Sequence, residues 1–147
     1  MREPYTQLYL HAVWATWDRL PLITPERQPV AYASIQKTCS NLGAHLIAIG
    51  GIEDHVHVLL RFPTTVCISD LVGKMKGASS RLVEQVSGEP FTWQGAYGAF
   101  TVSKRGVPIV REYVLNQVQH HRTGNLIHAL EVTSLEKPRP TDPASAR

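Results

Sequence analysis

The first pattern in the chain is a run of β-branched and aromatic residues over positions 5–17, in which successive side chains fall into two alternating sets. One set is Leu8, Leu10 and Ala12, and the other is Tyr9, His11 and Val13. Because side chains alternate between the two faces of a strand, this pattern predicts a first strand. After the loop at residues 20–27, apolar residues recur at near-helical spacing, which predicts a helix that ends before Gly43 as its C-cap.

Two further strands and a second helix follow in the middle of the chain. The apolar runs at residues 45–51 and 55–62 are separated by residues 52–54, a spacing typical of an antiparallel hairpin with a short acidic turn. From Ser69, a good N-cap residue, apolar residues return at helical spacing, with basic residues on or beside the other face. This amphipathic stretch predicts the second helix.

The last part of the chain predicts one more strand and one more helix. A Gly/Pro break at residues 88–90 precedes residues 99–103, which we expect to form the fourth strand. Pro108 lies near the first turn of a third helix, which we expect to end at Gly124. Residues 133–147 are rich in proline, serine and charge, so we expect a disordered C-terminal tail.

The element order β-α-β-β-α-β followed by a helix is that of the ferredoxin-like, or RRM-like, fold. We therefore expect an α+β protein with an antiparallel sheet, two helices on one face and a C-terminal helix. Residues 1–132 would form a single domain, because a chain of 147 residues is too short for two comfortable cores. The other sheet face would be free to carry a functional site, and the site has to decide the function.

The composition is that of an ordinary globular protein, with 43% hydrophobic and 18% charged residues. No segment has the apolar length that a membrane span requires, and the N-terminus lacks a secretory signal. Cys39 and Cys67 match neither a zinc pattern nor a disulfide framework, so we expect a cytoplasmic protein. The net charge of +3 and the pI near 9.0 permit phosphate binding without establishing it.

The pair His55 and His57 is the first candidate for chemistry. Both imidazoles would project from the free face of the sheet, while Val56 and Val58 pack beneath the helices. Two nitrogen ligands side by side on an accessible face suggest a metal site. Alternatively, the pair arises by chance in a chain with seven histidines, or decorates a solvated face.

The third predicted helix supplies the second candidate set. Tyr113 and Gln117 are four residues apart and therefore share one helical edge. If that edge docks on the free sheet face, the Gln117 carbonyl oxygen becomes a third ligand, and the mixed site suits Mg²⁺ or Mn²⁺. Alternatively, Tyr113 is half-buried in the core and Gln117 lies at the surface.

Together these groups suit phosphoryl transfer with a covalent intermediate. A divalent cation would polarise the scissile phosphate, the Tyr113 hydroxyl would attack phosphorus in line, and the 3′-oxygen would leave. The phosphotyrosine ester keeps the energy of the broken bond, so a DNA 3′-hydroxyl can attack it later and rejoin the strands. A tyrosine hydroxyl has an unperturbed pKa of about 10. The reaction therefore requires a proton acceptor, which the sequence does not identify.

Three motifs in register resemble the small single-tyrosine HUH transposases of bacterial insertion sequences. The motifs are GGIEDHVHVLL, FTWQGAYGAFTVS and VREYVLNQVQHHRT. The opening YTQLYLHAVWATWDR is similar to the first strand of that family, and LVGKMKGASSRLV is similar to its second helix. The resemblance covers about residues 5–122, nearly the whole of the expected folded part.

The resemblance implies that His55 and His57 bind the metal, that Gln117 is the third ligand and that Tyr113 is the nucleophile. It implies a transposase that cleaves and rejoins single-stranded DNA at insertion-sequence ends through a 5′-phosphotyrosine intermediate, with Mg²⁺ or Mn²⁺ as cofactor. It also implies a homodimer that recognises DNA hairpins, in which the histidines of one subunit can meet the tyrosine helix of the other. Residues 103–106 would be the hinge for that exchange.

Two further features bear on the resemblance. Asp54, directly before His55, is either a partner of that histidine or simply the turn residue, and we favour the turn. The chain also lacks the longer C-terminal extension of many relatives. We expect this difference to weaken recognition of DNA ends or to mark a variant, without removing a catalytic group.

Basic and aromatic residues elsewhere are candidate nucleic-acid contacts. The basic candidates are Lys74, Lys76, Arg81, Lys104 and Arg105. They would hold a DNA backbone by salt-sensitive attraction, unless they belong to a solvated helix face. Trp93 and Tyr97 are candidates for stacking on bases, with burial in the core or a dimer contact as the alternative. His120 and His121 are expected only to complement the helix dipole.

Two other functions stay open. The first is a domesticated HUH nickase that processes palindromic repeats or acts at replication origins, which genomic context would distinguish. The second is a non-catalytic nucleic-acid-binding module, whose binding would survive removal of the metal and of the Tyr113 hydroxyl. The combination of His55, His57, Tyr113 and Gln117 argues against a pure binder, which has no need of that set.

Overall fold

The structure is a computed structural model that describes residues 1–135. Its sheet consists of β1 (Tyr9–Ala15), β2 (His45–Ile52), β3 (His55–Arg61) and β4 (Gly98–Val102). The strands pair antiparallel in the order β2-β3-β1-β4, so the predicted ferredoxin-like α+β fold is confirmed. Of the tail expected to be disordered, residues 136–147 lie outside the described part of the chain.

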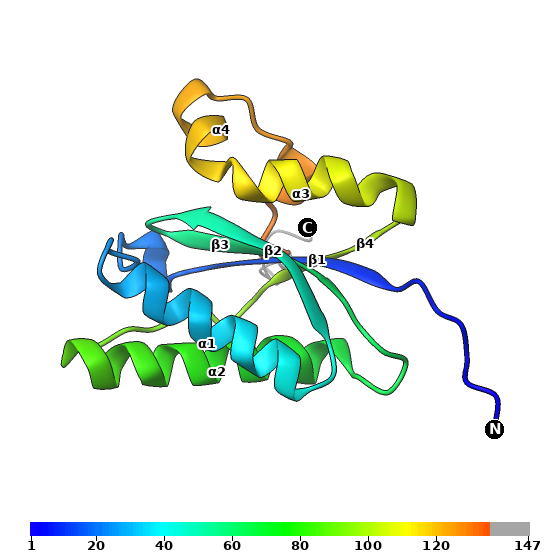
Figure 1. The fold of residues 1–147 in the computed structure, drawn as a ribbon. Coiled ribbons are helices and arrows are strands. Elements are labelled where there is room, and N and C mark those ends of the chain that lie inside the picture. The colour runs from blue at the N-terminus through cyan, green and yellow to red at the C-terminus, as the bar shows by residue number, and fades with distance from the viewer. Residues whose placement is uncertain (136–147) are drawn as a thin grey trace, which may run out of the picture.

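Helices cover both faces of the sheet (Figure 1). The helices are α1 (Arg27–Asn41), α2 (Ile68–Ser87), α3 (Val107–Leu115) and α4 (Gln117–Thr123), and the 3-10 turns are η1 (Trp17–Arg19), η2 (Lys104–Gly106) and η3 (His128–Leu130). The first two helices lie on one face, and α3 and α4 lie on the other. Within residues 1–135, no helix combines the length and the apolar character needed to cross a membrane.

The expectation of a free sheet face is therefore wrong, whereas the conditional prediction that the edge of the third predicted helix docks on that face is confirmed. On the face away from α1 and α2, Ala48 and Leu59 pack against Val114 of α3 and form a second, smaller core. These apolar strand residues would be exposed to water if no helix covered them. The main core lies on the opposite face, where Val56 and Val58 contact the helical layer.

Two glycines allow close approach on the face that α3 covers. A Cβ atom at Gly50 of β2 would lie 2.0 Å from the carbonyl oxygen of Val114 in α3. A Cβ atom at Gly98 of β4 would lie 2.0 Å from the carbonyl oxygen of Val132. Because glycine has no Cβ, α3 and the segment after α4 can both approach the sheet backbone.

Two helix boundaries differ from the prediction. Helix α2 begins at Ile68, with Cys67 rather than Ser69 as its N-cap. The third predicted helix is broken at Asn116, whose backbone (φ −106°, ψ 29°) leaves the helical region. The Asn116 side chain donates to the Glu112 carbonyl oxygen at 2.9 Å and competes with the helical backbone bonds. The predicted stop at Gly124 is confirmed, since this residue caps α4 directly after Thr123 and has the left-handed conformation.

Candidate functional site

His55 and His57 lie side by side on β3, on the sheet face that α3 covers. Both side chains are fully buried, and Val56 and Val58 belong to the main core on the other face. The predicted alternation along this strand is therefore confirmed. The expectation that the histidines are accessible on an open face is wrong, because α3, α4 and the segment after α4 cover them.

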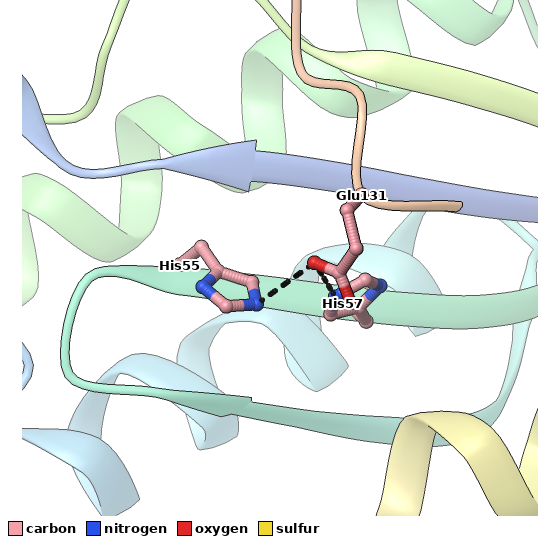
Figure 2. A group of neighbouring side chains, drawn as sticks. All are labelled: His55, His57 and Glu131. Carbon is pink, nitrogen blue, oxygen red and sulfur yellow. Dashed lines mark hydrogen bonds and ion pairs between the residues drawn. The ribbon is translucent and has the colours of Figure 1, made fainter. Parts of the chain in front are cut away.

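Three side chains meet between β3 and the segment after α4 (Figure 2). Nε2 of His55 and Nε2 of His57 lie 3.3 Å and 3.2 Å from the same oxygen of Glu131, its Oε2. The ligand atoms of the three residues lie within 4.8 Å of one another. These atoms are close enough for one cation to bind all three.

Gln117 and His121 of α4 extend this cluster. Oε1 of Gln117 lies 3.2 Å from Nε2 of His55, and Nε2 of His121 lies 3.1 Å from each of these two atoms. The Gln117 amide has a defined orientation, because its Nε2 donates to the Tyr113 carbonyl oxygen at 3.0 Å. The side-chain carbonyl oxygen is therefore directed toward His55, and Gln117 is buried rather than at the surface.

Tyr113 is buried beside the cluster. Its hydroxyl donates a hydrogen bond to Oε1 of Glu131 and accepts one from the backbone N–H of Ile127 at 3.2 Å. Its ring packs edge to face on His57, with 5.8 Å between the ring centres. Burial, and then the hydrogen bond to Glu131, raise the pKa of Tyr113 to about 12. The hydroxyl therefore keeps its proton at neutral pH.

Two carboxylates set the charge of the cluster. Oδ1 of Asp54 lies 2.7 Å from Nδ1 of His55. Burial opposes protonation of His55, but Asp54 and Glu131 outweigh it and raise the pKa of this histidine to about 9. Burial also opposes the charge of Glu131, yet hydrogen bonds from the histidines and the tyrosine hold its pKa well below the usual range. Asp54 is thus a partner of His55, and our preference for a role in the turn alone is wrong.

His11 of β1 is the neighbour of His57 on the side away from Glu131. Its Nε2 lies 2.8 Å from Nδ1 of His57, and both side chains are fully buried. Burial, and then the neighbouring His57, lower the pKa of His11 to about 3. Burial also lowers the pKa of His57. His11 is therefore neutral at neutral pH.

The donor set fits a divalent cation. The bond from Nδ1 of His55 to Asp54 directs its Nε2 toward the centre of the cluster, an arrangement typical of metal-binding histidines. The Gln117 and Glu131 side-chain oxygens both lie close to that nitrogen, so a cation at the centre would satisfy them together. Two imidazole nitrogens and two oxygens make a mixed ligand set rather than a structural zinc site of thiolates.

Three members of the cluster were not predicted from the sequence, namely His11, His121 and Glu131. His11 could have been found from the sequence, because the alternation in β1 places it on the same face as Val13. In the antiparallel pairing of β1 with β3, Val13 lies opposite His57. His121 follows Gln117 by four residues and shares its helical edge. The expectation that His121 only complements the helix dipole is therefore wrong. Glu131 directly follows the short 3-10 turn η3 and carries no periodic signal.

The predicted basic contacts do not join the cluster. Helix α2, on the opposite face of the sheet, carries Lys74, Lys76 and Arg81, while Lys104 and Arg105 are exposed in η2 before α3. Nζ of Lys76 donates to the carbonyl oxygens of Gln94 and Ala96 at 2.5 Å and 3.2 Å. This amine thus holds the segment before β4, and contact of the five residues with DNA stays a prediction.

The aromatic candidates belong largely to the core. Trp93 is buried, and its Nε1 donates to the Ser79 hydroxyl at 2.9 Å. Tyr97 is partly buried and packs against the main core. Burial was the alternative to base stacking, and it holds for Trp93. His120 packs against the Tyr113 ring, with 4.7 Å between the ring centres.

Comparison with known sequences identifies relatives over most of the chain. Residues 4–117 match the family described as IS200-like transposases. The chain is 26% identical over 121 residues to the transposase of insertion sequence element IS200 from Salmonella typhimurium, covering 78% of this chain and 79% of that protein. It is 27% identical over 119 residues to the ISDra2 transposase TnpA of Deinococcus radiodurans, covering 76% and 84% of the two chains.

Solved structures share the fold. A crystal structure of a protein from Deinococcus radiodurans assigned as a transposase matches with a TM-score of 0.64 and 26% identity, covering 80% of this chain and 98% of that one. The structure of a REP-associated tyrosine transposase bound to a REP hairpin matches with a TM-score of 0.61 and 12% identity, covering 86% and 76%. The family match ends at Gln117, so His121 and Glu131 lie beyond it.

Proposed function

The chain belongs to the IS200-like transposase family, and from this premise we propose that it cleaves and rejoins single-stranded DNA through a covalent bond to Tyr113. The observation that carries the proposal is the buried cluster in which Tyr113 lies against His57 and shares the Glu131 carboxylate with both histidines. Metal-assisted phosphoryl transfer requires a nucleophilic hydroxyl next to nitrogen and oxygen atoms that can bind the metal.

The proposed metal ligands are His55, His57 and Gln117, with Glu131 as a further oxygen. We propose Mg²⁺ or Mn²⁺ as the cofactor, since both favour oxygen ligands, which Gln117, Glu131 and a bound phosphate would supply beside the two imidazoles. When bound, such a cation polarises a phosphate oxygen and neutralises the charge that develops on it. Asp54 keeps Nε2 of His55 directed toward the centre, and the bond from Gln117 to the Tyr113 carbonyl orients the amide oxygen.

The proposed cleavage step transfers the DNA from one oxygen to another. The Tyr113 hydroxyl oxygen attacks phosphorus, the bond to the 3′-oxygen breaks, and the 5′-phosphate stays on the tyrosine. Oε1 of Glu131 accepts the hydrogen bond of the hydroxyl and orients its oxygen. The proton that the hydroxyl loses is balanced by the proton that the departing 3′-oxygen takes up, so the products are a phosphotyrosine and a free 3′-hydroxyl. In the rejoining step a 3′-hydroxyl attacks the phosphotyrosine, forms a new phosphodiester and releases the tyrosine.

We propose single-stranded DNA with hairpins at insertion-sequence ends as the substrate, and a homodimer as the working form. The REP-associated relative with a REP hairpin in its structure supports the hairpin proposal. The exposed Lys104 and Arg105 would hold the DNA backbone. Because Tyr113 contacts histidines of its own chain, exchange between subunits would require α3 to leave β2.

The test is a denaturing gel of the protein incubated with single-stranded oligonucleotides from both flanks of its gene. With Mn²⁺ we expect a covalent protein–DNA band, which disappears with EDTA and in Tyr113→Phe. Tyr97→Phe is the matched control, since Tyr97 packs against the main core away from the cluster.

The same gel distinguishes the other functions. DNA binding that persists without metal, with no covalent band on either flank, would contradict the transposase and leave a binding module. A covalent band formed only with palindromic repeats outside the element ends would indicate a domesticated nickase.

A further inference from the structure

His11 and His57 form an in-line hydrogen bond between two buried imidazole rings. Nε2 of His11 lies 2.8 Å from Nδ1 of His57, and the ring planes differ by 6°. The ring centres are 5.0 Å apart, close to the hydrogen-bond length plus one ring radius on each side. The rings therefore meet edge to edge in one plane rather than face to face, which is the geometry of a directed N–H···N bond.

We propose that His11 is a positioning residue, which accepts a hydrogen bond from Nδ1 of His57 and thereby holds Nε2 of His57 toward the bound cation. This inference rests on the proposed function and deepens its metal site. A neutral imidazole carries hydrogen on one nitrogen only. When Nε2 of His57 binds a metal, its hydrogen must be on Nδ1, and His11 is the acceptor at that nitrogen.

The two metal-site histidines are then oriented in the same way, each by a hydrogen-bond partner at Nδ1. Nδ1 of His55 is bonded to Asp54, and Nδ1 of His57 is bonded to His11, so both Nε2 atoms face the centre of the cluster. Partners of this kind set the ring orientation and hydrogen position of metal-binding histidines. Asp54 is part-exposed, whereas His11 is fully buried. A neutral acceptor suits the buried position, because a carboxylate there would be costly to remove from water.

The surroundings of His11 argue that the residue is there for this bond. His11 lies on an inner strand against the ring of Phe100, with 5.7 Å between the ring centres. Its other nitrogen, Nδ1, is buried without a hydrogen-bond partner among residues 1–135. An apolar residue would avoid this cost of burial, so packing alone does not account for a histidine here.

A histidine also permits the bond to reverse when the metal leaves. Nε2 of His57 lies 3.2 Å from Oε2 of Glu131 and can donate to it when no cation is bound. Nδ1 of His57 then becomes an acceptor, and Nε2 of His11 donates to it. Each ring moves one hydrogen between its own nitrogens by exchange with solvent, so the charge of the pair does not change.

The first test is binding of Mn²⁺ alone, followed by electron paramagnetic resonance, with thermal unfolding as the check that each variant is folded. We expect His11→Phe to raise the dissociation constant about 10- to 100-fold. We expect His11→Gln, whose side-chain oxygen can accept the same bond, to stay close to the wild-type value. His45→Phe is the matched control, since this histidine is exposed on β2.

The second test is long-range ¹H–¹⁵N NMR of the wild-type protein with Mg²⁺, which needs no variant. Hydrogen on Nδ1 of His57 supports the inference, and hydrogen on its Nε2 overturns it. Unchanged Mn²⁺ affinity in folded His11→Phe, or equal losses in His11→Gln and His11→Phe, overturns it as well. The proposed metal site itself is wrong if the wild-type protein does not bind Mn²⁺, or if His57→Ala binds Mn²⁺ as well as the wild type does. The inference then falls with the site.

Discussion

The Tyr113 hydroxyl donates its hydrogen bond to Glu131, the same carboxylate that contacts both metal-site histidines. One carboxylate oxygen accepts from the tyrosine, and the other lies 3.2 Å from Nε2 of His57 and 3.3 Å from Nε2 of His55. Glu131 therefore connects the nucleophile directly to the ligand nitrogens. A substitution of Glu131 should therefore alter the surroundings of Tyr113 and of both histidines.

Replacing Glu131 with glutamine is expected to lower the pKa of His55 in the metal-free protein. The carboxylate is one of the groups that raise this pKa to about 9, and its loss removes a negative charge beside the imidazolium. We expect a decrease of about one unit, measured by NMR titration. Glu112→Gln, an exposed site on α3, is the control. An unchanged His55 pKa in Glu131→Gln would contradict the contact.

The metal-free protein should become less stable as the pH rises from about 6.5 to about 9. The pKa of His55 is raised from 6.5 to about 9, so protonation of this residue favours the folded state. That contribution is complete below pH 6.5 and is lost as the pH passes through about 9. The pKa values of His11 and His57 are lowered in the folded protein. Protonation of these two histidines therefore favours the unfolded chain, at pH values below this window.

Asp54→Asn should flatten this pH dependence, because it removes the carboxylate that bonds Nδ1 of His55. The measurement is thermal unfolding in EDTA at a series of pH values between 6.5 and 9, the window set by the His55 pKa. Asp18→Asn, an exposed carboxylate of η1, is the control. A profile as steep in Asp54→Asn as in the wild type would show that another group causes the loss.

Gly50→Ala should destabilise the protein by roughly 1–3 kcal/mol, because the new methyl group would overlap the carbonyl oxygen of Val114. Helix α3 must then move away from β2 and carry Tyr113 with it. Gly73→Ala is the matched control, since a Cβ at this helical position meets nothing within 4 Å. It should stabilise α2 by up to about 1 kcal/mol. Urea unfolding measures both variants, and equal stability of the two would contradict the close packing of α3.

Gln117→Leu should weaken Mn²⁺ binding at least about tenfold and reduce covalent adduct formation in parallel. Leucine is similar in size but removes the oxygen that lies 3.2 Å from Nε2 of His55. Gln119→Leu is the matched control, because Gln119 is exposed on the same helix. Full Mn²⁺ affinity in Gln117→Leu would exclude this side chain from the ligand set.

The sequence predicted the strand layout well because its signals are local. Alternation along β3 correctly assigned Val56 to the main core and His57 to the other face. The free face was predicted wrongly because the pattern of one strand does not reveal a distant partner. Leu59 is buried on this face because Val114, which lies far along the chain, packs against it.

The candidate site was predicted as far as motif spacing reaches. His55 and Gln117 are 62 residues apart, and the structure brings them to 3.2 Å. The break at Asn116 was not predicted, because asparagine also occurs inside helices and the bond from its side chain to the Glu112 carbonyl oxygen is visible only in the structure. Glu131 was missed because its approach depends on the contact between Val132 and Gly98, which no local pattern encodes.

Mass spectrometry of the trypsin-digested adduct tests whether Tyr113 carries the DNA after cleavage. Trypsin cuts after Arg111 and Arg122, so residues 112–122 form a peptide whose single tyrosine is Tyr113. After nuclease trimming, we predict that this peptide gains the mass of a nucleotide joined through its 5′-phosphate to Tyr113. Cleaved DNA with this peptide unmodified, or with the nucleotide on another residue, would contradict the account.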